Sequence, residues 1–326
     1  MGNRLRFVAA LCLLILVMFT SCFAINDAKA KMAETLALFD VNYNGQVIRD
    51  LRYGDSPRNL YDLYLPEDMT SAKATHLILF IHGGSWTGGD KADGEVYCRN
   101  YAAHGYVAAS MSYTLKTEET DTNIMLVNEE VKAAVSAIKA ECEELGIPVS
   151  DMAISGFSAG ACQAMMYGFK EASSSALPVR FIIQMSGLTT LEPAVWRADG
   201  AIHWLELKAT GLDGSAEGDA AWISMFSGEK VTADMVRSGE AEAIWRKISP
   251  YTYVTPSSIP VLSAFGSLDG VVPPASRLVL EKALEENSVR YDTVVLAHSG
   301  HALGCDIDEM RRFLALIYTY CDEFFL

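Results

Sequence analysis

A serine between two glycines is the first residue of this chain whose setting suggests chemistry. Ser158 lies in the stretch AISGFSAGACQ, flanked by Gly156 and Gly160, where a short apolar run gives way to an alanine-rich one. Glycine and serine are common where a strand meets a helix, so the stretch could be a simple turn. The G-x-S-x-G spacing is also that of a nucleophile elbow, in which a strained turn projects the serine hydroxyl from a strand end. Ser158 is therefore a candidate nucleophile.

A serine hydroxyl needs a general base within hydrogen-bond reach, because it is a weak nucleophile at neutral pH. We expect His301 to be this base, since it follows the last apolar run, in the loop HSGHALG ahead of the final helical stretch. His298 is the alternative, although it could instead be packed into the sheet at a strand end. A purely structural role for His301 is the competing interpretation. The remaining histidines are His76, His82, His104 and His203.

An acid that orients the histidine should follow the preceding strand. Asp269 fits, because it comes after the apolar run IPVLSAFGS and opens the segment DGVVPP. An Asp-Gly pair is often no more than a turn, but the resulting chain order of serine, aspartate and histidine is one in which such triads occur. Asp292 stands at the start of its strand, which is the wrong end, and Asp306 follows the histidine. We therefore predict that Asp269 joins Ser158 and His301.

Acyl transfer also requires backbone amides that stabilise the tetrahedral oxyanion. We expect one from Ala159, directly after the serine, and the other from the loop FIHGGSWTGGD, which contains Gly84 and Ser85. Glycines in this loop let the backbone approach a bound carbonyl closely. His82 of the same loop is expected to brace it and not to act as the base.

These residues must be positioned by the elements around them. Apolar runs of strand length suit strands buried on both faces of a parallel sheet, and strands that alternate with helices predict an α/β fold with a mostly parallel sheet flanked by helices. Apolar residues recur at helical spacing in 122–146 and 306–325. The predicted strands lie within 40–54, 59–66, 76–84, 106–113, 151–158, 180–187, 259–267 and 291–300.

One stretch, about 190–250, interrupts this alternation. It shows no strong strand pattern, so we expect a mostly helical insertion over the carboxyl edge of the sheet, where open α/β sheets bind substrates. A loop packed elsewhere is the competing interpretation. Trp86 and Phe157, beside the expected oxyanion donors, are candidate walls of an apolar or sugar-stacking pocket, although aromatic residues serve equally well as core. The insertion adds Trp196, Trp204, Trp222 and Trp245.

Residues 1–30 are predicted to be a targeting segment. Two arginines precede the apolar run 7–20, and small residues follow near Ala24 and Ala30, which is the layout of a secretory signal peptide. The run is short for a membrane-spanning helix, but an uncleaved anchor is an alternative. The segment FTSC also resembles a bacterial lipobox, with Cys22 as the lipidated residue. In each case the domain formed by residues 31–326 is expected outside the cytoplasm, secreted or attached to the membrane.

Composition excludes some classes of function. The 326 residues include 26 basic and 41 acidic side chains, a formal net charge of −15, which provides no basic surface for nucleic acid. Five cysteines follow the predicted targeting segment without C-x-x-C spacing, so we expect no metal site, at least one free thiol unless chains pair, and mostly buried cysteines. The expected chemistry requires neither a metal nor an organic cofactor.

Taken in order, these motifs resemble the esterase/lipase branch of the α/β-hydrolase superfamily. Within it, the chain is most similar to secreted bacterial carboxylesterases allied to hormone-sensitive lipase, acetylxylan and feruloyl esterases and kynurenine formamidase. Ser85 replaces the third glycine of the HGGG form, Phe157 departs from the acidic residue of lipases proper, and the stretch 190–250 matches nothing in the pattern. The resemblance covers about residues 45–323 and rests on DLYLPED (62–68), LFIHGGSWTGGDK (79–91), ISGFSAGA (154–161), ISPYTYV (248–254), FGSLDGVVP (265–273) and HSGHALG (298–304).

The resemblance implies an α/β-hydrolase fold and a serine carboxylesterase that acts on small or carbohydrate-linked acyl groups. Ser158 would attack the ester carbonyl, His301 would take its proton, and Asp269 would hold the imidazole. The resemblance also implies an oxyanion hole formed by Gly84, Ser85 and Ala159. The same triad would also cleave amides, as formamidases and some peptidases do. A catalytically silent binding protein on this fold is a third hypothesis, and the complete set of triad residues argues against it.

Overall fold

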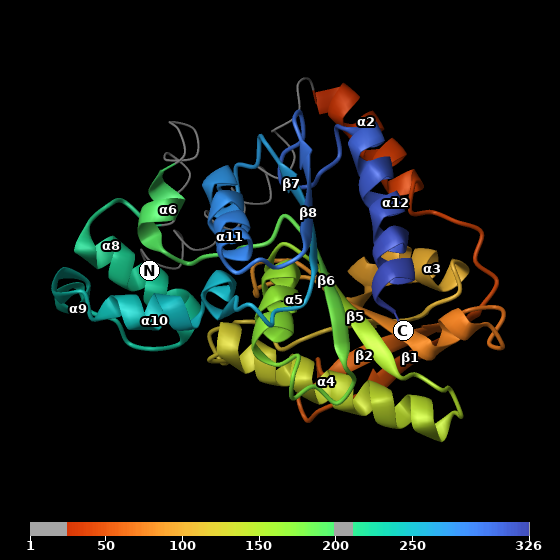
Figure 1. Ribbon diagram of the computed structural model, residues 1–326. Coiled ribbons are helices and arrows are strands. Elements are labelled where there is room, and N and C mark those ends of the chain that lie inside the picture. Colours follow the sequence, from red (N-terminus) through yellow and green to blue (C-terminus); the bar gives the residue numbers. More distant parts are fainter. Residues whose placement is uncertain (1–24, 199–210, 326) are drawn as a thin grey trace.

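The computed structural model describes residues 25–198 and 211–325, and within them eight strands form one central sheet (Figure 1). The strand order is β1-β2-β4-β3-β5-β6-β7-β8. β2 pairs antiparallel with β1 and with β4, and all other pairs are parallel. The bounds are β1 Gln46–Arg52, β2 Leu60–Leu65, β3 His76–Ile81, β4 Val107–Met111, β5 Asp151–Phe157, β6 Val179–Met185, β7 Val261–Gly266 and β8 Tyr291–Leu296.

The apolar runs of the sequence form the expected strands. Every residue of β3 and β4 is buried, because helices cover both faces of the sheet. β8 departs from the expectation of burial on both faces. It lies at the edge of the sheet, and only Val294 and Leu296 of this strand are buried. The mostly parallel sheet predicted from the sequence is confirmed.

Helices form a layer on each face of the sheet (Figure 1). α2 (Ile25–Ala37), α3 (Glu95–Ala103) and α12 (Ile307–Phe324) cover one face, and α4 (Ile124–Glu144), α5 (Ala159–Lys170) and α11 (Pro274–Glu286) cover the other. α4 and α12 confirm the two helices predicted from apolar spacing. Within the described ranges, short 3-10 helices lie in connections: η1 (Ala72–Thr75), η2 (Lys91–Gly94) and η3 (Pro250–Tyr253).

The insertion is helical where the structure describes it. It contains α6 (Pro193–Arg197), α8 (Ala216–Ser227), α9 (Ala233–Ser238) and α10 (Ala241–Lys247), whereas Trp204 lies outside the described residues. The Trp222 ring packs 4.7 Å from the rings of both Trp196 and Phe226. Phe226 in turn contacts Trp86 edge-on at 5.4 Å. The insertion therefore rests on the loop after β3, at the carboxyl edge of the sheet.

The N-terminal part of the described chain is helical. α2 begins at Ile25, so the predicted boundary at residue 30 falls inside a helix, and the hydroxyl of Thr35 donates a hydrogen bond to the carbonyl of Gly304 at 3.2 Å. Residues 1–24, with the apolar run and Cys22, lie outside the described residues. None of the helices in the described part of the chain is long and apolar enough to cross a membrane.

Four of the five cysteines that follow the predicted targeting segment behave as the sequence predicted, whereas Cys305 is disulfide-bonded. Among the described residues, the free thiols are all buried, which agrees with their expected role as small apolar side chains. They are Cys98, Cys142, Cys162 and Cys321.

Candidate active site

Ser158 occupies a strained turn between β5 and α5. Its φ of 56° and ψ of −120° are unusual for a residue with a side chain. The turn requires both flanking glycines: a Cβ on Gly160 would lie 2.0 Å from the carbonyl oxygen of Ile81, and one on Gly156 would lie 2.4 Å from the Gly160 backbone. The Ser158 amide donates to the carbonyl of Met185 at 2.8 Å. This geometry is that of a nucleophile elbow.

The structure brings the three predicted triad residues into one hydrogen-bonded chain. His301 Nε2 lies 2.8 Å from Ser158 Oγ, and His301 Nδ1 lies 2.8 Å from Asp269 Oδ2. The three residues follow β5, β7 and β8, whose carboxyl ends meet at one edge of the sheet. All three are buried, which excludes bulk water from the bonds that join them.

The carboxylate of Asp269 is held in one orientation by the backbone. Its Oδ1 accepts hydrogen bonds from the amides of Val271 and Val272, both at 2.8 Å. Oδ2 is therefore directed at His301 and accepts the hydrogen bond that the Nδ1–H of this imidazole donates. With the proton on Nδ1, the lone pair of Nε2 faces the Ser158 hydroxyl and can accept its proton.

The other histidine and aspartates considered for the triad lie in contacts of their own. The His298 side chain is 81% exposed and its Nδ1 binds Asp306 Oδ1 at 2.8 Å. The interpretation that His298 packs into the sheet at a strand end is therefore wrong. Asp292, at the start of β8, accepts a hydrogen bond from the hydroxyl of Tyr320 at 2.9 Å. Neither of these two contacts includes Ser158.

A second serine, which the sequence did not single out, supports the histidine loop. Ser186 follows β6 with a φ of 50°, is fully buried, and donates a hydrogen bond from its hydroxyl to the carbonyl of His301 at 2.9 Å. Its amide binds the carbonyl of Ala264 in β7. The Ser-Gly pair that ends the run RFIIQMSG is a local turn signal, but nothing in it indicates a partner more than a hundred residues away.

The three expected oxyanion donors lie in two segments: Gly84 and Ser85 in the loop after β3, and Ala159 directly after Ser158. Gly84 has a φ of 103° and Ser85 a φ of 53°, both of which are positive. Gly83 is so close that a Cβ on it would lie 3.1 Å from Ser158 Cβ. Across the described residues, the amides of Gly84, Ser85 and Ala159 donate to no protein acceptor. They are therefore available to a bound oxyanion.

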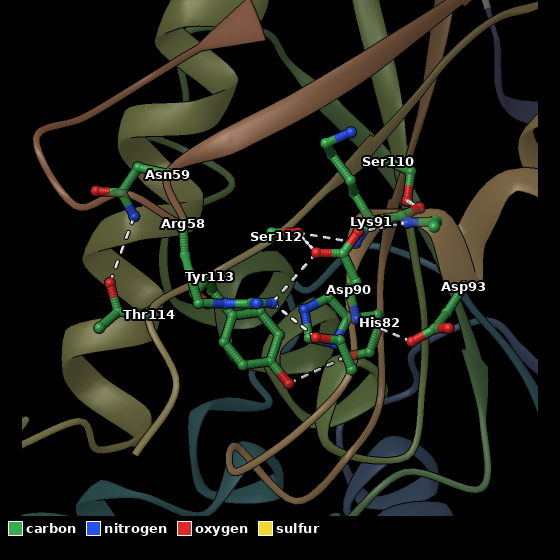
Figure 2. A network of polar contacts seen from close by, with 12 residues as sticks. Arg58, Asn59, His82, Asp90, Lys91, Asp93, Ser110, Ser112, Tyr113 and Thr114 are labelled. Carbon is green, nitrogen blue, oxygen red and sulfur yellow. Dashed lines mark hydrogen bonds and ion pairs between the residues drawn. The ribbon is translucent and has the colours of Figure 1, made fainter. Parts of the chain in front are cut away.

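His82 braces this loop, as expected from the sequence (Figure 2). Its Nδ1 binds the carbonyl of Gly83 at 2.7 Å, and its ring stacks on that of Tyr113 with centroids 4.2 Å apart. Burial lowers the pKa of His82 to about 4. The imidazole is therefore neutral at physiological pH, and its contacts are with the Gly83 carbonyl and the Tyr113 ring.

The two candidate pocket residues differ in their surroundings. Trp86 is 3% exposed and packs against Phe226, so it belongs to the core beneath the insertion and not to an open pocket wall. Trp196 and Trp222 are buried in the same way. Phe157 is only partly buried, and its ring lies 5.2 Å from the imidazole of His301. Of the two, Phe157 is the one that lies beside the reacting groups.

Residues 61–284, more than half of the chain, match the model of the protein family described as BD-FAE. The chain belongs to the BD-FAE family. The matched region includes Ser158 and Asp269 and ends before His301.

The chain is similar to named esterases. Over 258 residues it is 26% identical to esterase LipC of Mycobacterium tuberculosis, covering 78% of this chain and 59% of that protein. Over 122 residues it is 34% identical to a probable isoprenylcysteine alpha-carbonyl methylesterase of Oryza sativa, covering 36% of this chain and 28% of that protein. The chain thus spans less than two thirds of either relative.

Among solved structures, a truncated carbohydrate esterase from gut microbiota superposes with a TM-score of 0.67. The match covers 85% of this chain and 96% of that one at 18% sequence identity. At this identity the likeness concerns the fold, and it confirms the α/β-hydrolase architecture predicted from the motifs.

Proposed function

We propose that this protein is a carboxylic ester hydrolase that uses Ser158 as its nucleophile. The observation that carries the proposal is the unbroken chain of hydrogen bonds from Asp269 through His301 to Ser158, beside amides with no protein acceptor. The esterase names of the two relatives support the choice of an ester bond.

In the proposed reaction, Ser158 Oγ attacks the ester carbonyl while His301 Nε2 takes its proton. Asp269 keeps the imidazole in the required tautomer and stabilises the imidazolium. The amides of Ser85 and Ala159, with Gly84, stabilise the oxyanion. His301 returns the proton to the leaving alcohol and then activates the water that releases the acyl group.

For the substrate, we propose small acyl groups, including those linked to carbohydrate. A structural neighbour named as a carbohydrate esterase supports this class. Phe157 also offers an aromatic ring beside His301, on which a sugar or a short acyl chain can pack. We further propose that residues 1–24 direct the protein out of the cytoplasm or anchor it to a membrane, on the evidence of their composition.

The first test measures hydrolysis of p-nitrophenyl esters of increasing acyl length by the purified chain and by Ser158→Ala. We expect a wild-type preference for acetyl or propionyl esters and a loss of about 10⁴-fold or more in kcat for the variant. Ser155→Ala is the matched control, because it removes a buried hydroxyl on the same strand that binds Tyr101 at 3.2 Å. Turnover of aminoacyl amides but of no ester would move the function to amide hydrolysis.

A further inference from the structure

The loop that carries the expected oxyanion donors has a strained backbone. Ser85 and Trp86 both have positive φ, at 53° and 60°, and neither is a glycine. Gly84 and Gly89 also have positive φ, and a Cβ on Gly89 would lie 2.3 Å from His82 Nδ1. Such conformations persist only where the surroundings hold them. The position of the oxyanion donors therefore depends on contacts from outside the loop.

Arg58, from the turn between β1 and β2, supplies such contacts. Its Nη2 donates to the carbonyl of Gly89 at 2.6 Å, and its Nε donates to the carbonyl of Tyr113 at 3.0 Å. Nη2 also lies 3.6 Å from the carboxylate of Asp90. Figure 2 shows the guanidinium between Tyr113 and Asp90. A single side chain thus joins the loop after β3 to the segment after β4.

Tyr113 links Arg58 to the start of the loop that contains Gly84 and Ser85. Its hydroxyl is 3.2 Å from the carbonyl oxygens of both His82 and Gly83, and its ring supports the His82 imidazole. Arg58 therefore holds one end of the loop directly, at Gly89, and the other end through Tyr113.

The turn that bears Arg58 is itself fixed. The hydroxyl of Tyr53 donates to the carbonyl of Ser112 at 2.6 Å, and Asn59 Nδ2 donates to Glu130 at 2.9 Å. Asn59 is buried, and its amide group also reaches Tyr53. Arg58 thus projects from a rigid base, so its guanidinium restrains the loop and does not simply follow it.

We propose that Arg58 is a positioning residue for the oxyanion hole. It acts on the reaction through Gly89 and Tyr113 and touches no reacting atom. The inference rests on the proposed function, because it assigns Arg58 a role in that same site. Since oxyanion donors act mainly in the transition state, loss of Arg58 should lower kcat and leave KM nearly unchanged.

The test compares Arg58→Gln and Arg58→Lys with the wild type. Lysine keeps the charge but cannot bond two carbonyls with a planar fork. We expect kcat for p-nitrophenyl acetate to fall about 10- to 100-fold for glutamine, the range caused by small misplacements in active sites, with an intermediate value for lysine and KM within about twofold. The same ratio is expected for the rate at which a fluorophosphonate labels Ser158, because phosphonylation uses the same oxyanion donors.

Arg180→Gln is the matched control. The Arg180 side chain is 32% exposed, as is that of Arg58, and its Nε binds the buried carboxylate of Asp151 at 2.8 Å. This pair lies at the amino ends of β5 and β6, the end of the sheet away from Ser158. We expect Arg180→Gln to lower the melting temperature at least as much as Arg58→Gln and to leave kcat and the labelling rate within about twofold.

Equal losses in the two arginine variants, or a rise in KM without a fall in kcat, would overturn the proposal. If the wild type is labelled by fluorophosphonate but hydrolyses no ester, the ester proposal fails and the labelling ratio still decides the role of Arg58. A wild type that is neither labelled nor active would overturn both proposals.

Discussion

Replacing Asp269 with asparagine tests the geometry of the site most directly. Asp269 Oδ1 accepts the amides of Val271 and Val272, so the carbonyl oxygen of an asparagine should take that position. The NH₂ group would then face His301 Nδ1 and donate to it. The imidazole proton would then have to sit on Nε2. A protonated Nε2 has no free lone pair and cannot accept the proton of Ser158.

The size of the effect follows from these contacts. Turning the asparagine to offer its oxygen to His301 would leave two amides unpaired, that of Val271, which is partly buried, and that of Val272, which is buried, at about 1–3 kcal/mol each. At about 1.4 kcal/mol per amide, the active orientation would be about 1% populated, since 1.4 kcal/mol is a factor of about ten. Activity should therefore fall at least about 100-fold. The lost carboxylate charge, which no longer stabilises the imidazolium, should bring the fall in kcat toward about 10⁴-fold.

The assay is steady-state hydrolysis of p-nitrophenyl acetate, with urea unfolding to check the fold. Asp306→Asn is the matched control. Asp306 and His298 form a similar carboxylate–imidazole pair in the loop that carries His301, with 2.8 Å between Asp306 Oδ1 and His298 Nδ1. We expect the control to retain kcat within about threefold. An Asp269→Asn variant that is folded and within tenfold of the wild type would refute the assignment of Asp269.

Two further predictions concern stability. Gly160→Ala should destabilise the protein by about 3 kcal/mol or more in urea unfolding, because its Cβ would meet the Ile81 carbonyl. Gly146 has a φ of 71°, but a Cβ on it would have no other atom within 4 Å, so Gly146→Ala should destabilise the protein by only about 1 kcal/mol. Equal losses of unfolding free energy in the two variants would contradict the packing argument. Since the pKa of His82 is lowered to about 4, its neutral form contributes stability that is complete above about pH 6.5 and is lost as the pH falls toward 4. From pH 7 to 5 the wild type should lose about 2 kcal/mol more unfolding free energy than His82→Asn, and parallel pH profiles would show that His82 is not buried as described.

Local sequence determined the elements and the elbow. The apolar runs predicted the strands because a strand covered on both faces needs apolar residues at every position. The glycines around Ser158 predicted its turn because neighbouring backbone leaves no room for a Cβ. The edge position of β8 was not predictable in this way, since the run at 291–300 resembles that of a central strand.

Tertiary structure decided between the alternatives that the sequence left open and added contacts that no motif marks. His298 and His301 stand in one loop, each beside an aspartate of its own, and only the path of the loop brings His301 to Ser158. Trp86 was a candidate pocket residue until the packing of Phe226 placed it in the core. Arg58 lies in a polar turn with no motif around it, and its partners become apparent only when β1 and β2 join the sheet. Residue spacing determines the local helices, strands and turns, because these depend on neighbours along the chain. Contacts between distant elements depend on how the whole core packs.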